Sequence, residues 1–176
     1  MSVEQRIEQL EQRLHRLESE NAIRACMNRY MELCDDLNAA TPLDELGELF
    51  TADARWEGKG ARYANSFGGY RGRAAIKAML AQYMVEPAHF ALNVHFLCSE
   101  LIRVEGTTAS ASWVMLQTSS FAAGGSHLNA ARLTVTFREE DGVWRMAHFQ
   151  TENLFGRPVE AWNSDAHLPV PGKADA

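Results

Sequence analysis

The stretch NVHFLCSELIRVEGTTASASWVMLQTSSF, residues 93–121, decides the fold, because from about Phe90 onward the apolar period of the chain changes to two. A period of two is typical of a β-strand with one buried face. The turn residues Glu105-Gly106 divide the stretch into two strands. Further hairpin signals follow at Gly124-Gly125 and Asp141-Gly142. The sequence therefore predicts an antiparallel meander of four strands, at residues 93–105, 108–121, 127–139 and 143–149.

Upstream of this meander the chain is mainly helical in pattern. Residues 3 to about 38 predict a long helix whose first part carries Ile7, Leu10, Leu14 and Leu17 at 3-4-3 spacing. These are about two heptads, fewer than a free-standing coiled coil needs. The segment could pair with a neighbouring subunit or lie across its own domain. The remaining upstream predictions are a helix at 43–50, a strand at 54–58, a loop or irregular hairpin at 58–72, and a helix at 73–83.

Helices followed by a run of strands predict an α+β fold, with N-terminal helices packed on one face of a curved, mostly antiparallel sheet. A sheet partly closed around helices forms a cone with a deep apolar mouth, which suits a small-molecule site. We predict a helical extension at 1–20, one α+β barrel domain at 21–156, and an irregular, Pro-rich C-terminal arm at 157–176.

Composition restricts the class of function. The chain has 176 residues and a net charge of −6, and this charge disfavours nucleic acid as a partner. No secretory signal and no run of about 18 apolar residues is visible, so we expect neither export nor a membrane span. Three cysteines without a CxxC pair suit a reducing cytoplasm.

Two ionisable residues stand in apolar surroundings. Asp35 falls beside the apolar stripe of the first helix, at the border of the core, with Asp36 slightly further out. His95 lies in the apolar run of the first meander strand, where it should alternate with Leu97, Ser99 and Leu101. If the fold joins Asp35 to His95, they form a base oriented by a carboxylate. The alternative is a structural pair, or two unrelated side chains.

Other candidates line the expected pocket. Tyr30 lies in the apolar helix stripe, where its hydroxyl either completes the core packing or binds a substrate oxygen. Trp56, Tyr83 and Trp113 are predicted wall residues. His127, Asn129 and Arg132 are predicted to share one face of the third meander strand, either inside the cone or in solvent. The chain has no HxH, HExxH or GxGxxG spacing, so we expect no metal and no nucleotide cofactor.

Several strings, taken in order, resemble the SnoaL-like branch of the nuclear transport factor 2-like superfamily, over roughly residues 20–150. They are Ala22-Ile23-Arg24 before Tyr30 and Asp35, Leu49-Phe50-Thr51-Ala52-Asp53-Ala54-Arg55-Trp56, Gly69-Tyr70-Arg71-Gly72, His95 before Ile102-Arg103-Val104-Glu105-Gly106, and Asp141-Gly142-Val143-Trp144-Arg145. The chain departs from the family pattern at Phe96, where a second histidine is common, and at Phe149, where an arginine is common.

The resemblance implies a cone-shaped barrel, commonly a homodimer or homotrimer, and a cofactor-independent lyase. It implies that Asp35 and His95 act as a catalytic dyad with Tyr30, and that Arg132 matches a family arginine. The expected substrate is a hydrophobic, aromatic or polycyclic hydroxylated small molecule, as in aromatic compound catabolism. The alternatives are an isomerase or polyketide cyclase of the same fold, or a non-catalytic binding module.

Overall fold

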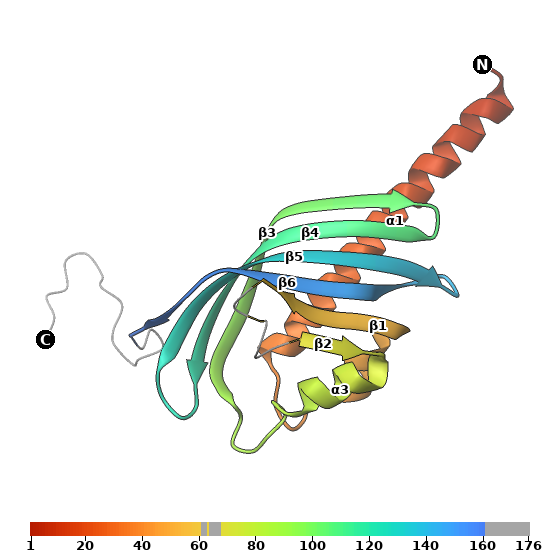
Figure 1. Ribbon diagram of the computed structural model, residues 1–176. Helices are drawn as coiled ribbons and strands as arrows, with labels where there is room; N and C mark the ends of the chain where they lie inside the picture. Colours follow the sequence, from red (N-terminus) through yellow and green to blue (C-terminus); the bar gives the residue numbers. More distant parts are fainter. Residues whose placement is uncertain (61–62, 64–67, 161–176) are drawn as a thin grey trace, which may run out of the picture.

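The computed structural model describes residues 1–60, 63 and 68–160, and its elements follow the predicted order (Figure 1). The predicted α+β fold, with helices before a long-stranded sheet, is confirmed. The helices are α1 (Val3–Asp35), α2 (Leu43–Glu48) and α3 (Arg73–Ala81). The strands are β1 (Phe50–Lys59), β2 (Gly68–Arg71), β3 (Phe90–Glu105), β4 (Thr108–Phe121), β5 (Ser126–Glu140) and β6 (Val143–Val159).

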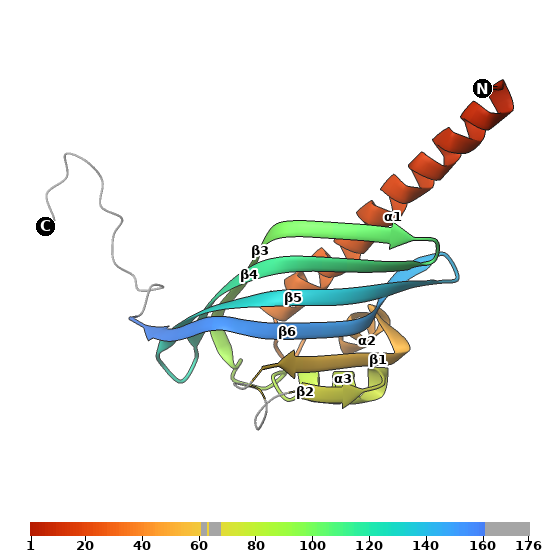
Figure 2. The same ribbon diagram turned by 45° about the horizontal axis from the view of Figure 1, so that its top comes forward.

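The six strands form one curved sheet in the order β2-β1-β6-β5-β4-β3 (Figures 1 and 2). Strands β1 and β6 are parallel, and every other neighbouring pair is antiparallel. Because β2 and β3 lie at opposite edges, the sheet curves without closing into a barrel. Helix α1 contacts β3 and β6, and α3 contacts β1 and β2.

One apolar cluster fixes the position of α1 against the sheet. Ile23 and Met27, one helical turn apart, are fully buried, as is Phe50 at the start of β1. They belong to the same cluster as Leu133 and Phe137 of β5. Burial of such side chains is the main source of stability in a domain of this size. The second half of α1 is therefore held in a defined place over the sheet.

A β-bulge interrupts β3 next to Ser99, whose φ of 53° is unusual for a residue other than glycine. A bulge inserts one residue and exchanges the faces on which later side chains lie. Before it, His95 and Leu97 point toward the concave side; after it Ile102 takes that side and Leu101 is 47% exposed. The predicted alternation of His95 with Leu101 on one face is therefore wrong.

Strand β6 continues further than predicted. It pairs with β5 as far as Val159, so the prediction of irregular chain from Arg157 is wrong for its first three residues. Pro158 is tolerated because β1 pairs with β6 only as far as Glu152, which leaves the end of β6 at a sheet edge. Glu160 follows the strand, and residues 161–176 of the predicted arm lie outside the described residues.

The N-terminal part of the chain is continuous with the domain. Helix α1 runs unbroken from Val3, and its first buried side chain is Ser19. Residues 3–20 of the predicted extension thus form the first part of a single helix, which is exposed as far as Glu18. Within the described ranges, no helix combines the length and the apolar character that crossing a lipid bilayer requires.

Candidate active site

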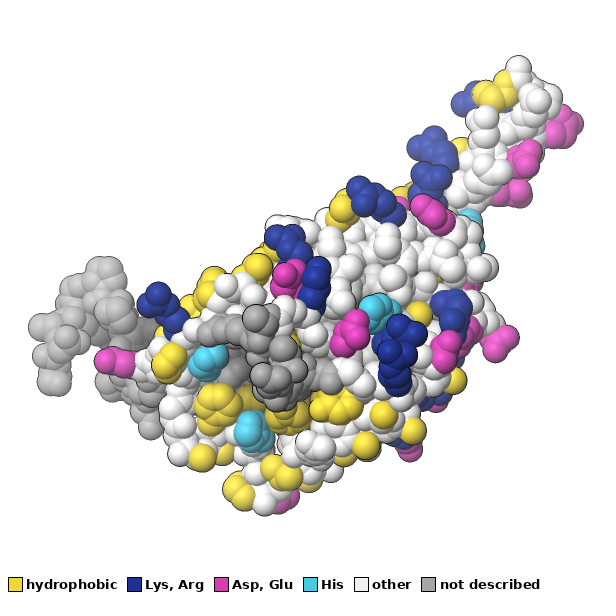
Figure 3. Space-filling model, viewed as in Figure 1, with side chains coloured by type: hydrophobic (Ala, Val, Ile, Leu, Met, Phe, Trp, Pro, Cys, Tyr) yellow, Lys and Arg dark blue, Asp and Glu magenta, His cyan; other side chains and the backbone are white. Residues whose placement is uncertain are grey.

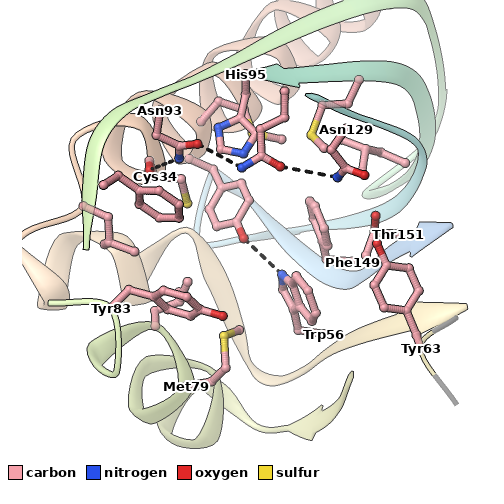
Figure 4. A pocket seen from close by; sticks show the side chains of 18 residues that line it. Cys34, Trp56, Tyr63, Met79, Tyr83, Asn93, His95, Asn129, Phe149 and Thr151 are labelled. Atoms are coloured by element: carbon pink, nitrogen blue, oxygen red, sulfur yellow. Dashed lines mark hydrogen bonds between the residues drawn. The ribbon is translucent and has the colours of Figure 1, made fainter. Parts of the chain in front are cut away.

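A cavity of about 250 Å³ lies between the concave face of the sheet and helices α1 and α3 (Figure 4). Its walls are mainly apolar and aromatic, and a few polar side chains from the long strands point into it. This composition is typical of a small-molecule pocket. The lining includes Tyr30, Trp56, Tyr83, Asn93, His95, Gln117 and Asn129.

The end of α1 positions Asp35. The helix ends at this residue because a hydrogen-bonded turn follows it. In this turn the side chain of Asn38 donates to the Asp36 carboxylate at 2.9 Å. The Thr41 hydroxyl donates to the Asp36 carbonyl at 2.8 Å and caps the same turn. Asp36 is thereby held at the surface, and Asp35 turns toward the sheet.

Asp35 and His95 meet. The Nδ1 atom of His95 lies 2.5 Å from Oδ1 of Asp35, and the backbone N–H of His95 donates to the same oxygen at 3.0 Å. The side chains are 10% exposed for His95 and 29% exposed for Asp35. These two contacts with one carboxylate oxygen fix both the backbone of His95 and the orientation of its ring. A partly desolvated carboxylate in this position orients the imidazole.

This contact determines which ring nitrogen faces the cavity. In a neutral imidazole, the hydrogen bond to the carboxylate places the ring hydrogen on Nδ1 and leaves the lone pair on Nε2. Among the described residues, no side chain is hydrogen-bonded to Nε2, and no buried side-chain nitrogen or oxygen lacks a partner. The Nε2 atom is therefore open to the cavity that His95 lines (Figure 4).

Tyr30 and Trp56 form the deep end of the pocket. The indole Nε1 of Trp56 donates to the hydroxyl of Tyr30 at 3.0 Å, and both rings pack against Phe149. Burial raises the pKa of Tyr30 well above its ordinary value; the Cys34 thiol adds to this, and the bond from Trp56 acts against it. Tyr30 is therefore a neutral phenol that can donate a hydrogen bond.

A row of polar side chains crosses the sheet next to His95. His95, Gln117 and Asn129 are direct cross-strand neighbours on β3, β4 and β5. Asn93 donates to the Cys34 carbonyl at 2.9 Å and accepts from Gln117 at 2.9 Å. Asn129 donates to Gln117 at 3.5 Å, so that the amides form one connected chain (Figure 4). The row provides fixed polar groups beside an otherwise apolar chamber.

Three of the predicted substrate-binding residues, Trp56, Tyr83 and Asn129, line the inner cavity. His127 lies further out, in a second cavity of about 440 Å³. The two cavities share Tyr83 and Asn129. The site therefore consists of an inner chamber and a wider mouth.

Two predicted residues do not reach the pocket. Trp113 is 3% exposed and packs edge-on against Phe137, outside the cavity lining, so it fills the closed part of the core. Arg132 is exposed on the opposite face from Asn129. Strands β4 and β5 pair without a register shift, so strict alternation separates these two positions. The predicted trio on one face is wrong for Arg132.

Asn93 and Gln117 line the cavity but were not predicted from the sequence. The signal for Asn93 was available, because it stands two residues before His95 and so on the same strand face. Gln117 could be found only from the register between β3 and β4. Over the described ranges, no three His, Cys, Asp or Glu side chains converge as a metal site requires.

The cysteines provide a test of the burial around the site. Burial raises the pKa of Cys26 and of Cys34 to about 12, so on the order of one thiol in ten thousand is ionised at pH 8. Cys98 is exposed. Since only the thiolate reacts, we expect Ellman's reagent to modify one thiol in the native protein at pH 8 and all three in denaturant. Cys98→Ser should remove the fast reaction; fast modification of two native thiols would contradict this packing.

The chain resembles known proteins both in its sequence, through a family match, and in its fold. The SnoaL-like domain family matches residues 15–150. No curated protein has significant sequence similarity to the chain.

Solved structures share the fold. A hexachlorocyclohexane dehydrochlorinase (LinA) of type 2 has a TM-score of 0.68 at 21% identity, over 91% of this chain and 99% of its own. A scytalone dehydratase-like protein from Novosphingobium aromaticivorans DSM 12444 has a TM-score of 0.67 at 22% identity, over 91% and 97%. A protein of the nuclear transport factor 2-like class from Novosphingobium aromaticivorans has 26% identity and a TM-score of 0.62, over 82% and 88%.

Proposed function

The chain belongs to the SnoaL-like domain family, and on this premise we propose that it is a cofactor-independent lyase whose base is His95, oriented by Asp35. The observation that carries the proposal is the 2.5 Å contact between His95 Nδ1 and Asp35, which leaves Nε2 open to the cavity. Neighbours of the same fold are named as a dehydrochlorinase and as scytalone dehydratase-like, and both names denote eliminations.

In the proposed reaction, Nε2 of His95 takes a proton from a substrate carbon. The electron pair of that C–H bond forms a new C=C bond, and the bond to the leaving group on the adjacent carbon breaks. A halide leaves with its electron pair as an anion. A hydroxyl leaves as water, after receiving a proton from the His95 imidazolium or from Tyr30. Asp35 stabilises the imidazolium that exists between these steps.

Where the leaving group is a hydroxyl, hydrogen bonds beside the base hold its oxygen, which gains negative charge as its bond to carbon breaks. Tyr30 is neutral because burial raises its pKa, so its hydroxyl can donate to a substrate oxygen without first releasing a proton. The amides of Gln117 and Asn129 stand next to His95 in the same polar row. Donors fixed before the reaction stabilise developing charge more effectively than mobile water does.

The shape of the site restricts the substrate class. An inner chamber of about 250 Å³ is slightly smaller than the roughly 300–1,000 Å³ usual for ligand pockets, so we propose that one or two rings enter it. The aromatic walls of Trp56, Tyr83 and Phe90 favour a flat, apolar ring. The wider mouth at His127 leaves room for a substituent.

The test is turnover of a panel of one- and two-ring compounds that carry a hydroxyl or halogen next to a C–H bond, without added metal or cofactor. We expect products that have lost water or hydrogen halide, identified by mass spectrometry. A product of unchanged mass with a moved double bond would instead favour an isomerase. Saturable binding with no turnover across the panel would contradict the lyase and favour a binding module.

A further inference from the structure

Among the residues that the structure describes, none packs over the first half of α1. All side chains from Met1 to Glu18 are exposed, and this part of the helix projects away from the domain (Figures 1 and 3). Its start is well defined: Ser2 accepts from the Gln5 backbone at 3.2 Å and donates its own N–H to the Gln5 side chain at 2.8 Å. Such a capping box fixes the first turn of a helix.

The projecting helix carries an exposed apolar seam. Five residues recur at intervals of four and three and are each at least 50% exposed: Val3, Ile7, Leu10, Leu14 and Leu17. This is the spacing of a coiled coil, with Ile7 and Leu14 at positions a and the other three at positions d. A seam of this kind is costly to leave in water, so it points to a second helix.

The charges beside the seam decide which second helix fits. Positions e are acidic (Glu4, Glu11 and Glu18), whereas the first two g positions are Arg6 and Arg13. Figure 3 shows Lys and Arg side chains on one flank of the projecting helix and Asp and Glu side chains on the other. The helix is thus acidic on one side of its seam and basic on the other.

A copy of the same helix complements this pattern in one orientation. When two copies lie parallel and in register, Arg6 of one copy faces Glu11 of the other, and Arg13 faces Glu18. In the antiparallel orientation, g faces g and e faces e, so like charges meet along both flanks. Charge pairs at e and g are the usual determinant of partner and orientation in coiled coils.

We propose that residues 3–17 of α1 join two copies of this chain in a parallel, in-register, two-stranded coiled coil. Ile at position a with Leu at the adjacent d favours two strands, and Asn21 falls on the next position a, where a polar residue enforces register. Two heptads suffice in this setting because α1 is already nucleated by its second half, in which Ile23 and Met27 are fully buried.

The test uses charge exchange in the full-length protein, monitored by sedimentation equilibrium. Arg6→Glu/Arg13→Glu and Glu11→Arg/Glu18→Arg should each weaken self-association by roughly tenfold or more, because like charges then meet across the seam. An equimolar mixture of the two variants should associate at least as tightly as wild type, and so should the chain with all four substitutions. Because these side chains are exposed, thermal unfolding should be unchanged in dilute protein.

Orientation is read from cross-linking in a Cys98→Ser background. Leu17→Cys should form a disulfide-linked dimer under mild oxidation, because two d positions face each other only in the parallel register. Gln12→Cys, on the outer face of the helix, is the matched control and should not form it. A monomeric wild type at 100 µM and above, self-association that ignores the charge variants, or equal cross-linking of both cysteines would overturn the proposal.

Discussion

His95→Gln is expected to lower kcat/KM for elimination by about 10²–10⁴-fold, the usual contribution of a positioned general base. Glutamine retains the size and polarity of the imidazole and can still donate to Asp35, but it has no nitrogen lone pair that accepts a proton at neutral pH. The loss should therefore appear in kcat, with KM nearly unchanged. Steady-state kinetics on the substrate identified by the panel measures it.

His148→Gln is the matched control for this substitution. His148 also pairs with a carboxylate, at 2.8 Å from Glu57, but it does not line the cavity. Its removal should change kcat/KM by less than about threefold, since it cannot reach a substrate. If His95→Gln retained activity within tenfold of wild type, or if both variants lost activity equally, His95 would not be the base.

Asp35→Asn is expected to lower kcat/KM by about 10²-fold or more. The amide oxygen of asparagine can still accept from Nδ1 and from the backbone N–H of residue 95, so the position of the ring should be nearly retained. The negative charge that stabilises the imidazolium is lost, and so is the strength of a charge-assisted hydrogen bond. Comparison of kcat with the affinity for a non-reactive substrate analogue separates this effect from a loss of binding.

The order of elements could be predicted because local signals determine it. The change of apolar period near Phe90 and the turns at Glu105-Gly106 and Asp141-Gly142 mark strands without any knowledge of tertiary contacts. The position of Asp35 at the border of the core follows from helical periodicity in the same way. These features depend on residues close together in the chain.

The position of Gln117 could not be predicted, because it depends on a bulge with no local signal. An unbroken ladder from the pair Glu105–Thr108 would place Thr118 opposite His95. The bulge shifts the register by one residue and brings Gln117 there instead. A glycine would have indicated a positive φ, but the residue in that conformation is Ser99.

The predictions that Arg132 and Trp113 line the pocket were wrong for different reasons. The face of Arg132 follows from strict alternation with Asn129, so that the error could have been avoided from the sequence. Trp113 does lie on the inner face of β4, but its depth along the strand excludes it from the cavity. That depth depends on how the sheet curves around α1, and the resemblance to a cone-shaped family did not fix it.

In the proposed site, Asp35 and not its neighbour Asp36 completes the pair with His95. The most direct test measures kcat/KM for Asp35→Asn and Asp36→Asn side by side, since the two changes are chemically identical and one residue apart. Asp36 is exposed and bonded to Asn38 in the turn that ends α1. We expect a loss of about 10²-fold or more for Asp35→Asn and of less than about threefold for Asp36→Asn. Equal activities of the two folded variants would contradict it.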